Sequence, residues 1–388
     1  MARVGEVCRA LDTAPGVVSA GAVGRSAATA TALGLGLAAL DDLRAWGLRL
    51  GVHALGGRGR ALIRQPALRV VVFGSLSIAL SLLMVCTMPL VLLAVSPLLL
   101  GVPHLVADVR YLVVQPGYHR RLWLALPVAA VLLGAASGLG MRAGLSAMAV
   151  TLLLASRRAR DSRLRSFLRR ALGLSLVGGL AYLGLSSDFY YLDLGMAHAH
   201  NFIAVGFAAL WLTRRPSAGL PRWSLALPVV LFIGAAVLLA CGVLSASPAA
   251  LSLFDEDPQL GLDGARWLLA PYLSAEQGTR IVLLFAFAQA VHYGVWLRLV
   301  PDVARERDTP RSFSSSLAAL RQQIGPTLLG LSLLVFCGLM LYALIDLAEA
   351  RDRYFRIAMF HGHLELCVLA LVWVEGLPPL SRQPRGAA

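Results

Sequence analysis

The chain contains no lysine and few charged residues of any kind. Charged side chains make up 14% of the 388 residues and hydrophobic ones 58%, a balance typical of a membrane protein with many spans. The net charge of +14 comes from arginines that cluster between apolar runs. This placement is typical of cytoplasmic loops, so we interpret the charge as a sign of topology and expect no nucleic-acid partner.

Cysteine is also scarce, and other familiar site signatures are missing. The five cysteines show no CxxC spacing, which predicts neither a disulfide framework nor a zinc ribbon. The sequence has no glycine-rich phosphate loop, nucleophile elbow or zincin motif. Any functional site is therefore expected among the polar residues of the apolar segments.

Long uncharged runs predict an all-α fold, a polytopic bundle of about ten transmembrane helices. No charged residue lies between Arg69 and Asp108, a run long enough for two helices, and we expect the turn between them near Ser96-Pro97. Eight further segments approach the ~20 residues that a bilayer requires. They are residues 122–140, 142–156, 171–187, 191–213, 223–245, 279–300, 325–346 and 352–375.

Arginine-rich and acidic connections alternate along the chain, which predicts its orientation. If the N-terminus is cytoplasmic, arginine-rich loops such as 157–170 and 214–222 all fall inside, and the acidic loop around Asp255 falls outside. Trp296 and Arg298 are then expected to anchor the inner end of the eighth span at the membrane surface.

Three regions follow from this topology. Residues 1–67 form an N-terminal cytoplasmic or interfacial segment with an amphipathic helix, 68–378 form the transmembrane bundle, and 379–388 form a cytoplasmic tail. We expect an integral protein of a bacterial-type inner membrane, in contact with membrane lipids and with both termini cytoplasmic.

Six histidines lie inside the apolar segments, on four spans that all run from outside to inside, and most lie at similar depth. They are His104, His198, His200, His292, His361 and His363. An imidazole in hydrocarbon is costly unless a metal, a proton path or a polar partner receives it. We therefore predict a common metal site to which each of the four spans contributes a histidine.

Two carboxylates accompany the histidines at helical spacing. Asp108 follows His104 by four residues, and Glu365 follows His361 by four, so each pair shares a helix face. A buried carboxylate beside an imidazole suits ligation, or orientation of a ligand through a hydrogen bond.

Two amides lie beside the other histidines. Gln289 precedes His292 by three residues on the same face, and Asn201 directly follows His200. His198 and His200 point about 200° apart on a helix, so one is expected to face the cluster and the other a neighbouring helix, a carbonyl or a second site.

Imidazole nitrogens with carboxylate oxygens suit iron, zinc or copper, whereas the lack of paired thiolates argues against an iron–sulfur cluster. A metal buried in apolar surroundings is accessible to lipophilic substrates and to O2. This favours redox-active Fe2+ and an oxygenase-like oxidoreductase that acts on an isoprenoid or acyl lipid.

Three short segments carry a resemblance to a known family. Residues 101–108 read GVPHLVAD, residues 291–294 read VHYG, and residues 360–363 read FHGH. In this order they resemble the G-x-P-H-x-x-x-D signature, the I-H-F-G element and the closing histidine pair of the bacterial membrane β-carotene dioxygenases, the Brp/Blh family.

The resemblance implies a metal and a reaction. In that family four histidines bind a non-haem iron that cleaves β-carotene to retinal. By position, His104, His292 and either His361 or His363 would be ligands here, and a carotenoid would be the substrate.

Two other classes fit the same residues. In a b-type haem electron carrier, pairs of facing histidines would ligate the haem, and a Soret band would reveal it. In a proton- or metal-coupled transporter, the histidines, Asp108, Gln289 and Glu365 would line the path.

Overall fold

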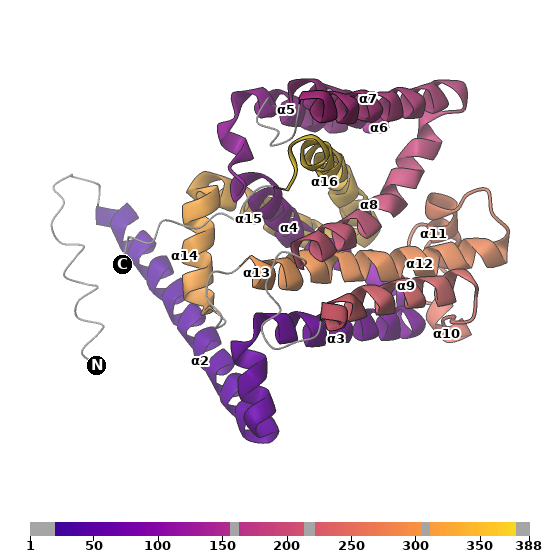
Figure 1. Ribbon diagram of the computed structural model, residues 1–388. Helices are drawn as coiled ribbons and strands as arrows, with labels where there is room; N and C mark the ends of the chain where they lie inside the picture. The colour runs from indigo at the N-terminus through magenta and orange to yellow at the C-terminus, as the bar shows by residue number, and fades with distance from the viewer. Residues whose placement is uncertain (1–19, 156–162, 213–221, 305–310, 378–388) are drawn as a thin grey trace. The chain divides into compact units, whose positions relative to one another are not determined.

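The computed structural model describes residues 20–155, 163–212, 222–304 and 311–377, and every regular element in these ranges is a helix (Figure 1). The α-helices are α2 (Ala20–Arg64), α3 (Pro66–Thr87), α4 (Pro89–Asp108), α5 (Leu122–Ala136), α6 (Gly140–Leu154), α7 (Arg163–Ser186), α8 (Phe189–Leu212), α9 (Leu227–Ala240), α10 (Pro248–Leu251), α11 (Leu262–Leu269), α12 (Ala275–Gly294), α13 (Val300–Val303), α14 (Phe313–Ile324), α15 (Pro326–Ala343) and α16 (Leu347–Glu375). Shorter π- and 3-10 segments are η1 (Val109–Val114), η2 (Tyr118–Arg120), η3 (Arg222–Ala226) and η4 (Val295–Leu299). The tail 379–388 and parts of the connections 157–170 and 214–222 lie outside the described residues.

Six helices in the described ranges are long and apolar enough to cross a membrane, so the predicted all-α membrane bundle is confirmed at this level. They are Pro66–Thr87, Pro89–Val114, Arg163–Ser186, Ala275–Val303, Pro326–Ala343 and Leu347–Glu375. Helices α5, α6 and α9 are apolar but shorter. The count of ten spans and the orientation of the termini stay predictions.

The first two spans meet at Met88, so the expected turn near Ser96-Pro97 is wrong. Helix α3 ends at Thr87, and Pro89 begins α4 at a position where its missing N–H costs no helical hydrogen bond. The 22 residues of α3 are already long enough to cross a bilayer, whereas a turn at Ser96 would leave a first helix far too long. Pro97 is consequently inside α4, and His104 lies in the last third of that helix.

Helices α12 and α16 form the centre of the bundle (Figure 1). Helix α12 packs against α3, α4, α8, α9 and α11, and α16 packs against α4, α5, α6, α7, α8 and α15. In the most apolar stretches of α4 and α12, 67% of the residues are buried, against 6% in α15. The largely buried helices α4, α12 and α16, together with the more exposed α8, are the four that carry the six histidines.

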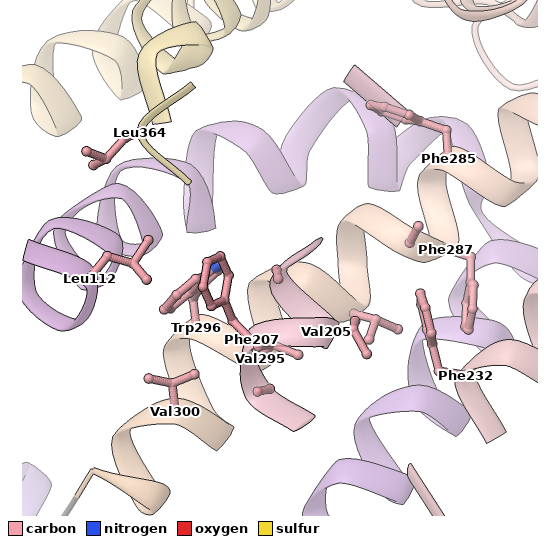
Figure 2. Close-up of a cluster of buried hydrophobic side chains, with 14 of the residues drawn as sticks. Leu112, Val205, Phe207, Phe232, Phe285, Phe287, Val295, Trp296, Val300 and Leu364 are labelled. Atoms are coloured by element: carbon pink, nitrogen blue, oxygen red, sulfur yellow. The ribbon is translucent and has the colours of Figure 1, made fainter. Parts of the chain in front are cut away.

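Buried hydrophobic side chains from several helices pack around α12 and η4 (Figure 2). The rings of Phe232 on α9 and Phe287 on α12 stack with centroids 5.6 Å apart. Trp296 is fully buried and meets the ring of Trp211 edge-on at 5.8 Å. The expected role of Trp296 as a surface anchor is therefore wrong, because it lies four residues after His292 and shares the buried face of that helix.

The described chain divides into two compact units: one holds the residues up to Arg60 together with Arg311–Ala319, and the other holds the rest. In the smaller unit, the carboxylate of Asp41 on α2 accepts hydrogen bonds from the backbone N–H groups of Phe313 and Ser314 at 2.5 and 3.3 Å. The Ser314 hydroxyl donates to the same carboxylate at 2.5 Å. Asp41 thus supplies acceptors for the unpaired N–H groups at the first turn of α14.

Candidate metal centre

Four of the six histidines meet at one point in the bundle. His104 from α4, His200 from α8, His292 from α12 and His361 from α16 have ring centroids 4.8 to 5.8 Å apart in the five closest pairs. His104 and His292 are each 1% exposed and His361 is 7% exposed. Each of the four predicted spans therefore contributes one imidazole to a common cluster, in which three of the rings are buried and His200 is half-buried.

Asp108 belongs to the same cluster. Its carboxylate and one nitrogen from each of His104, His292 and His361 lie within 4.8 Å of one another, a spacing that could hold a metal ion. The side chain of Asp108 is fully buried and has no hydrogen-bond partner among the described residues. The spacing of four residues between His104 and Asp108 places both on the face of α4 that meets α12 and α16.

Backbone carbonyls orient two of the imidazoles. The Nδ1–H of His200 donates to the carbonyl of Met196 at 3.2 Å, and the Nδ1–H of His361 donates to the carbonyl of Ala358. These bonds assign the proton to Nδ1 and leave the lone pair on Nε2. Ligating histidines typically use their second nitrogen in this way, which fixes the tautomer and the ring orientation.

The arrangement is unfavourable without a cation. The Nε2 atoms of His104 and His361 face each other at 3.4 Å, and both nitrogens of His292 lack a partner among the described residues. Burying such groups unpaired costs roughly 1–3 kcal/mol for each neutral group and more for a carboxylate. A positive ion among the four rings would satisfy these nitrogens and Asp108 together, so the residues present fit a metal.

Tyr354 and Tyr293 connect His104 to the surrounding helices. The hydroxyl of Tyr354 on α16 lies 3.5 Å from Nδ1 of His104, and the ring of Tyr293 lies 4.7 Å from the His104 ring. Gln289 donates to the Tyr293 hydroxyl at 2.9 Å, so this predicted residue reaches the site through Tyr293. A Cβ at Gly101 would lie 2.3 Å from the Tyr354 ring, so only glycine at this position lets Tyr354 approach His104.

Glu365 is a close neighbour of Asp108. Its carboxyl group is fully buried, interacts electrostatically with Asp108, and has no hydrogen bond of good geometry among the described residues. The indole N–H of Trp296 is a close neighbour of Glu365. The four-residue spacing from His361 thus brings Glu365 to the border of the site, as the predicted shared face requires.

Helices α4 and α12 both widen just after their site residues. The π-helical segment η1 begins at Val109, directly after Asp108, and η4 begins at Val295, three residues after His292. Single π-helical turns inside α-helices occur frequently at functional sites. The two segments therefore mark the same level of the bundle as the histidines.

Three predicted site residues lie outside the cluster. His198 points away from it, with Nε2 3.0 Å from the carbonyl oxygen of Leu269 on α11. His363 is buried against α6, where a Cβ at Gly144 would lie 2.4 Å from its Nδ1. Asn201 is fully buried and its Nδ2 donates to the carbonyl of Ala197 at 3.2 Å, while its Oδ1 has no partner in the described part of the chain.

Sequence reasoning missed Tyr354 and misassigned Trp296. Tyr354 precedes His361 by seven residues, so both lie on one stripe of α16, and this spacing could have identified it. Trp296 follows His292 by four residues with the same consequence.

Comparisons with protein-family models, with curated proteins and with solved structures find no match to this chain.

Proposed function

We propose that this protein is a membrane-embedded, non-haem iron oxidoreductase whose iron is held by His104, His200, His292 and His361. The observation that carries the proposal is the convergence of four imidazoles from four separate helices on one point of the bundle, where three of them are buried. Asp108 is close enough to complete the ligand set or to balance its charge. Such a concentration of ionisable groups at membrane depth is expensive to maintain without a task.

Iron is favoured among the metals that accept nitrogen and carboxylate ligands. Zinc and copper accept similar donors, so the donor set alone leaves three candidates. The segments 101–108, 291–294 and 360–363, which resemble motifs of the Brp/Blh β-carotene dioxygenases, are the ones that bring His104, His292 and His361 together. Bound iron would supply redox chemistry with O2, as the resemblance implies.

The chain's own residues would orient the ligands and exclude water. The carbonyls of Met196 and Ala358 fix two imidazoles, and Tyr354 approaches a third. The surrounding apolar helices keep the site dry, so electrostatic interactions inside it are strong. A substrate that reaches this depth is lipophilic, such as a carotenoid, another isoprenoid or an acyl lipid.

A b-type haem is less compatible with the arrangement. Two axial imidazoles must leave the plane between them free for the porphyrin. Here the His292 ring lies 5.1 Å from the His104 ring and 5.8 Å from the His361 ring, and the His200 ring lies 5.0 Å from the His361 ring, so the space that a porphyrin would need is filled.

The proposal includes the predicted topology: ten spans in a bacterial-type inner membrane, with both termini cytoplasmic. It is supported by the alternation of arginine-rich and acidic connections. Cysteines introduced at Ser245 and Ser162 test it, because the proposal expects external labelling at position 245 and internal labelling at position 162. Labelling of position 245 from the cytoplasmic side alone overturns it.

The function is tested by elemental analysis and an optical spectrum of detergent-purified protein, followed by a lipid-oxidation assay. We expect about one iron per chain, no Soret band, and O2-dependent oxidation of an apolar substrate. His104→Ala should abolish iron content and turnover, whereas His53→Ala, at an exposed position on α2, should preserve both. A Soret band supports the haem carrier, and metal flux in proteoliposomes without oxidation supports the transporter; either result refutes the oxidoreductase.

A further inference from the structure

The two ends of α16 differ in how their arginines are paired. Where the helix begins, the guanidinium of Arg353 lies 2.7 Å from the carboxylate of Glu349. Where it ends, three segments of the chain together contain nine arginines but only two acidic residues. These segments are 115–130, 150–175 and 366–377, and the two acids are Asp161 and Glu375. Positive charge therefore exceeds negative charge at this end of the helix.

Two contacts bring these segments together at the last turn of α16. The guanidinium of Arg121, directly before α5, lies 2.8 Å from the carboxylate of Glu375. The indole N–H of Trp373 donates to the backbone carbonyl of Arg169 on α7 at 2.9 Å. Helix α16 also packs against α5 and α7. The starts of α5 and α7 consequently lie beside the end of α16.

The arginines at this end divide into paired and unpaired ones. Arg121 is accounted for by its ion pair with Glu375 and by the ring of Tyr118, whose centroid is 4.9 Å from the guanidinium carbon. In contrast, Arg120 and Arg163 are exposed, and neither forms an ion pair with a described residue. Their charges satisfy nothing within the described chain, so they are available to an anion from outside it.

Large apolar side chains beside these arginines face outward. Leu122 on α5 is 84% exposed and Leu126 is 67% exposed, and their spacing of four residues places both on one face of that helix. Trp373 is 48% exposed, and tryptophan is enriched where a membrane meets water. Arginines next to an exposed apolar helix face are the arrangement expected where lipid head groups meet acyl chains.

We propose that this end of the bundle binds one anionic phospholipid, with its phosphate at Arg120 and an acyl chain along the exposed face of α5. The unpaired arginines require an anion, and the exposed leucines require an apolar chain. A phospholipid supplies both in one molecule, whereas free phosphate supplies only the charge. The predicted topology places this end at the cytoplasmic leaflet, where anionic lipids attract clusters of arginine.

The lipid site is separate from the candidate metal centre. Glu375 follows His361 by 14 residues on α16, which is about 21 Å along the helix axis. Lipid binding therefore requires neither a metal nor turnover. A failure of the iron proposal leaves the lipid proposal standing, and the reverse also holds.

The test is native mass spectrometry of the detergent-purified full-length protein with two lipids that have the same acyl chains. Phosphatidylglycerol has a net anionic head group, whereas the choline of phosphatidylcholine cancels the charge of its phosphate. We expect one phosphatidylglycerol to bind each chain in preference to phosphatidylcholine, and the preference to weaken as salt is added. Inorganic phosphate in millimolar excess should not displace the bound lipid.

Matched variants locate the site. Arg120→Gln should lower the affinity for phosphatidylglycerol about fivefold, the equivalent of roughly 1 kcal/mol for one arginine near an anionic surface. Arg120→Lys should retain most of the affinity because it keeps the charge. Arg353→Gln, at an exposed position near the start of α16, should leave the affinity unchanged. Each variant should remain monodisperse with its metal content preserved, because both positions are exposed.

Three results would overturn the proposal. Equal binding of the two lipids would exclude recognition of the anionic head group. Displacement by inorganic phosphate would exclude a lipid as the occupant. An equal loss of affinity in Arg120→Gln and Arg353→Gln would exclude the end of α16 as the site.

Discussion

Two pairs of histidines separated by a single residue have different surroundings in this bundle. His200 and His361 join His104 and His292 at the candidate metal centre. In contrast, His198 lies beside the carbonyl of Leu269 on α11, and His363 packs against Gly144 on α6. Each outlying histidine is two residues from a member of the centre, which turns its side chain by about 200°. The two members of each pair are the same residue type at nearly the same depth. Only the direction in which each side chain leaves its helix separates a candidate ligand from a packed side chain.

The largest expected effect is the contrast between His361 and His363. His361→Ala removes a nitrogen of the centre and should lower metal affinity by more than the roughly 10–100-fold typical of an outer partner. His363→Gln should retain the metal. Metal content per mole of monodisperse protein measures both effects. An equal loss of metal in the two variants would contradict the claim that His361 is a ligand and His363 is not.

The second contrast is on α8. His200→Ala should reduce metal content and turnover strongly, because its Nδ1–H is committed to Met196, which leaves the Nε2 lone pair for a metal, and its ring lies about 5 Å from those of His292 and His361. His198→Gln should change neither by more than about twofold, well below the effect of losing an outer partner. If instead His198→Gln loses the metal and His200→Ala keeps it, the centre is built from the wrong member of the pair.

The contrast extends to the residues that hold His104 in place. Tyr354→Phe removes the hydroxyl 3.5 Å from Nδ1, and we expect about a tenfold loss of metal affinity. Gly101→Ala should have a larger effect, since its Cβ would displace the Tyr354 ring. Isothermal titration with Fe2+ or Zn2+ measures both; an unchanged affinity in Gly101→Ala would show that Tyr354 does not position the imidazole.

The smallest effect is expected in the unit formed by α2 and the start of α14. Hydrogen bonds from the Ser314 hydroxyl and the backbone of α14 hold the pKa of Asp41 below its ordinary value. A lowered pKa in the folded state means that this contact is complete above the ordinary value and is lost as the pH falls through the folded value. The protection of the Phe313 and Ser314 amides against exchange, measured relative to their intrinsic rates at each pH, should therefore fall only in acid.

Asp41→Asn should quicken the same exchange at neutral pH without changing metal content. A loss of metal in the Asp41→Asn variant would show that the small unit affects the metal centre, which contradicts the expectation that the two are independent.

The sequence predicted much of this site because its informative features are local. The apolar runs predicted the helices, and the spacing of Asp108 from His104 and of Glu365 from His361 predicted shared faces. These inferences need only helix geometry. The same reasoning predicted which four helices contribute a histidine to the common cluster.

What the sequence could not decide depends on neighbours. The choice of His200 over His198 follows from which face of α8 packs against α12 and α16. The break at Met88 depends on which of several proline positions ends a helix of membrane length, and local propensity is similar at each. Tyr354 joins the site because α16 packs against α4 at Gly101, a contact between residues some 250 positions apart.

X-ray absorption at the iron edge of the purified protein tests the central claim most directly. The account predicts a first shell of nitrogen and oxygen, with the outer-shell scattering pattern of several imidazoles that is lost in the His104→Ala variant. A sulfur shell, a porphyrin pattern, or an imidazole pattern that survives His104→Ala would contradict it.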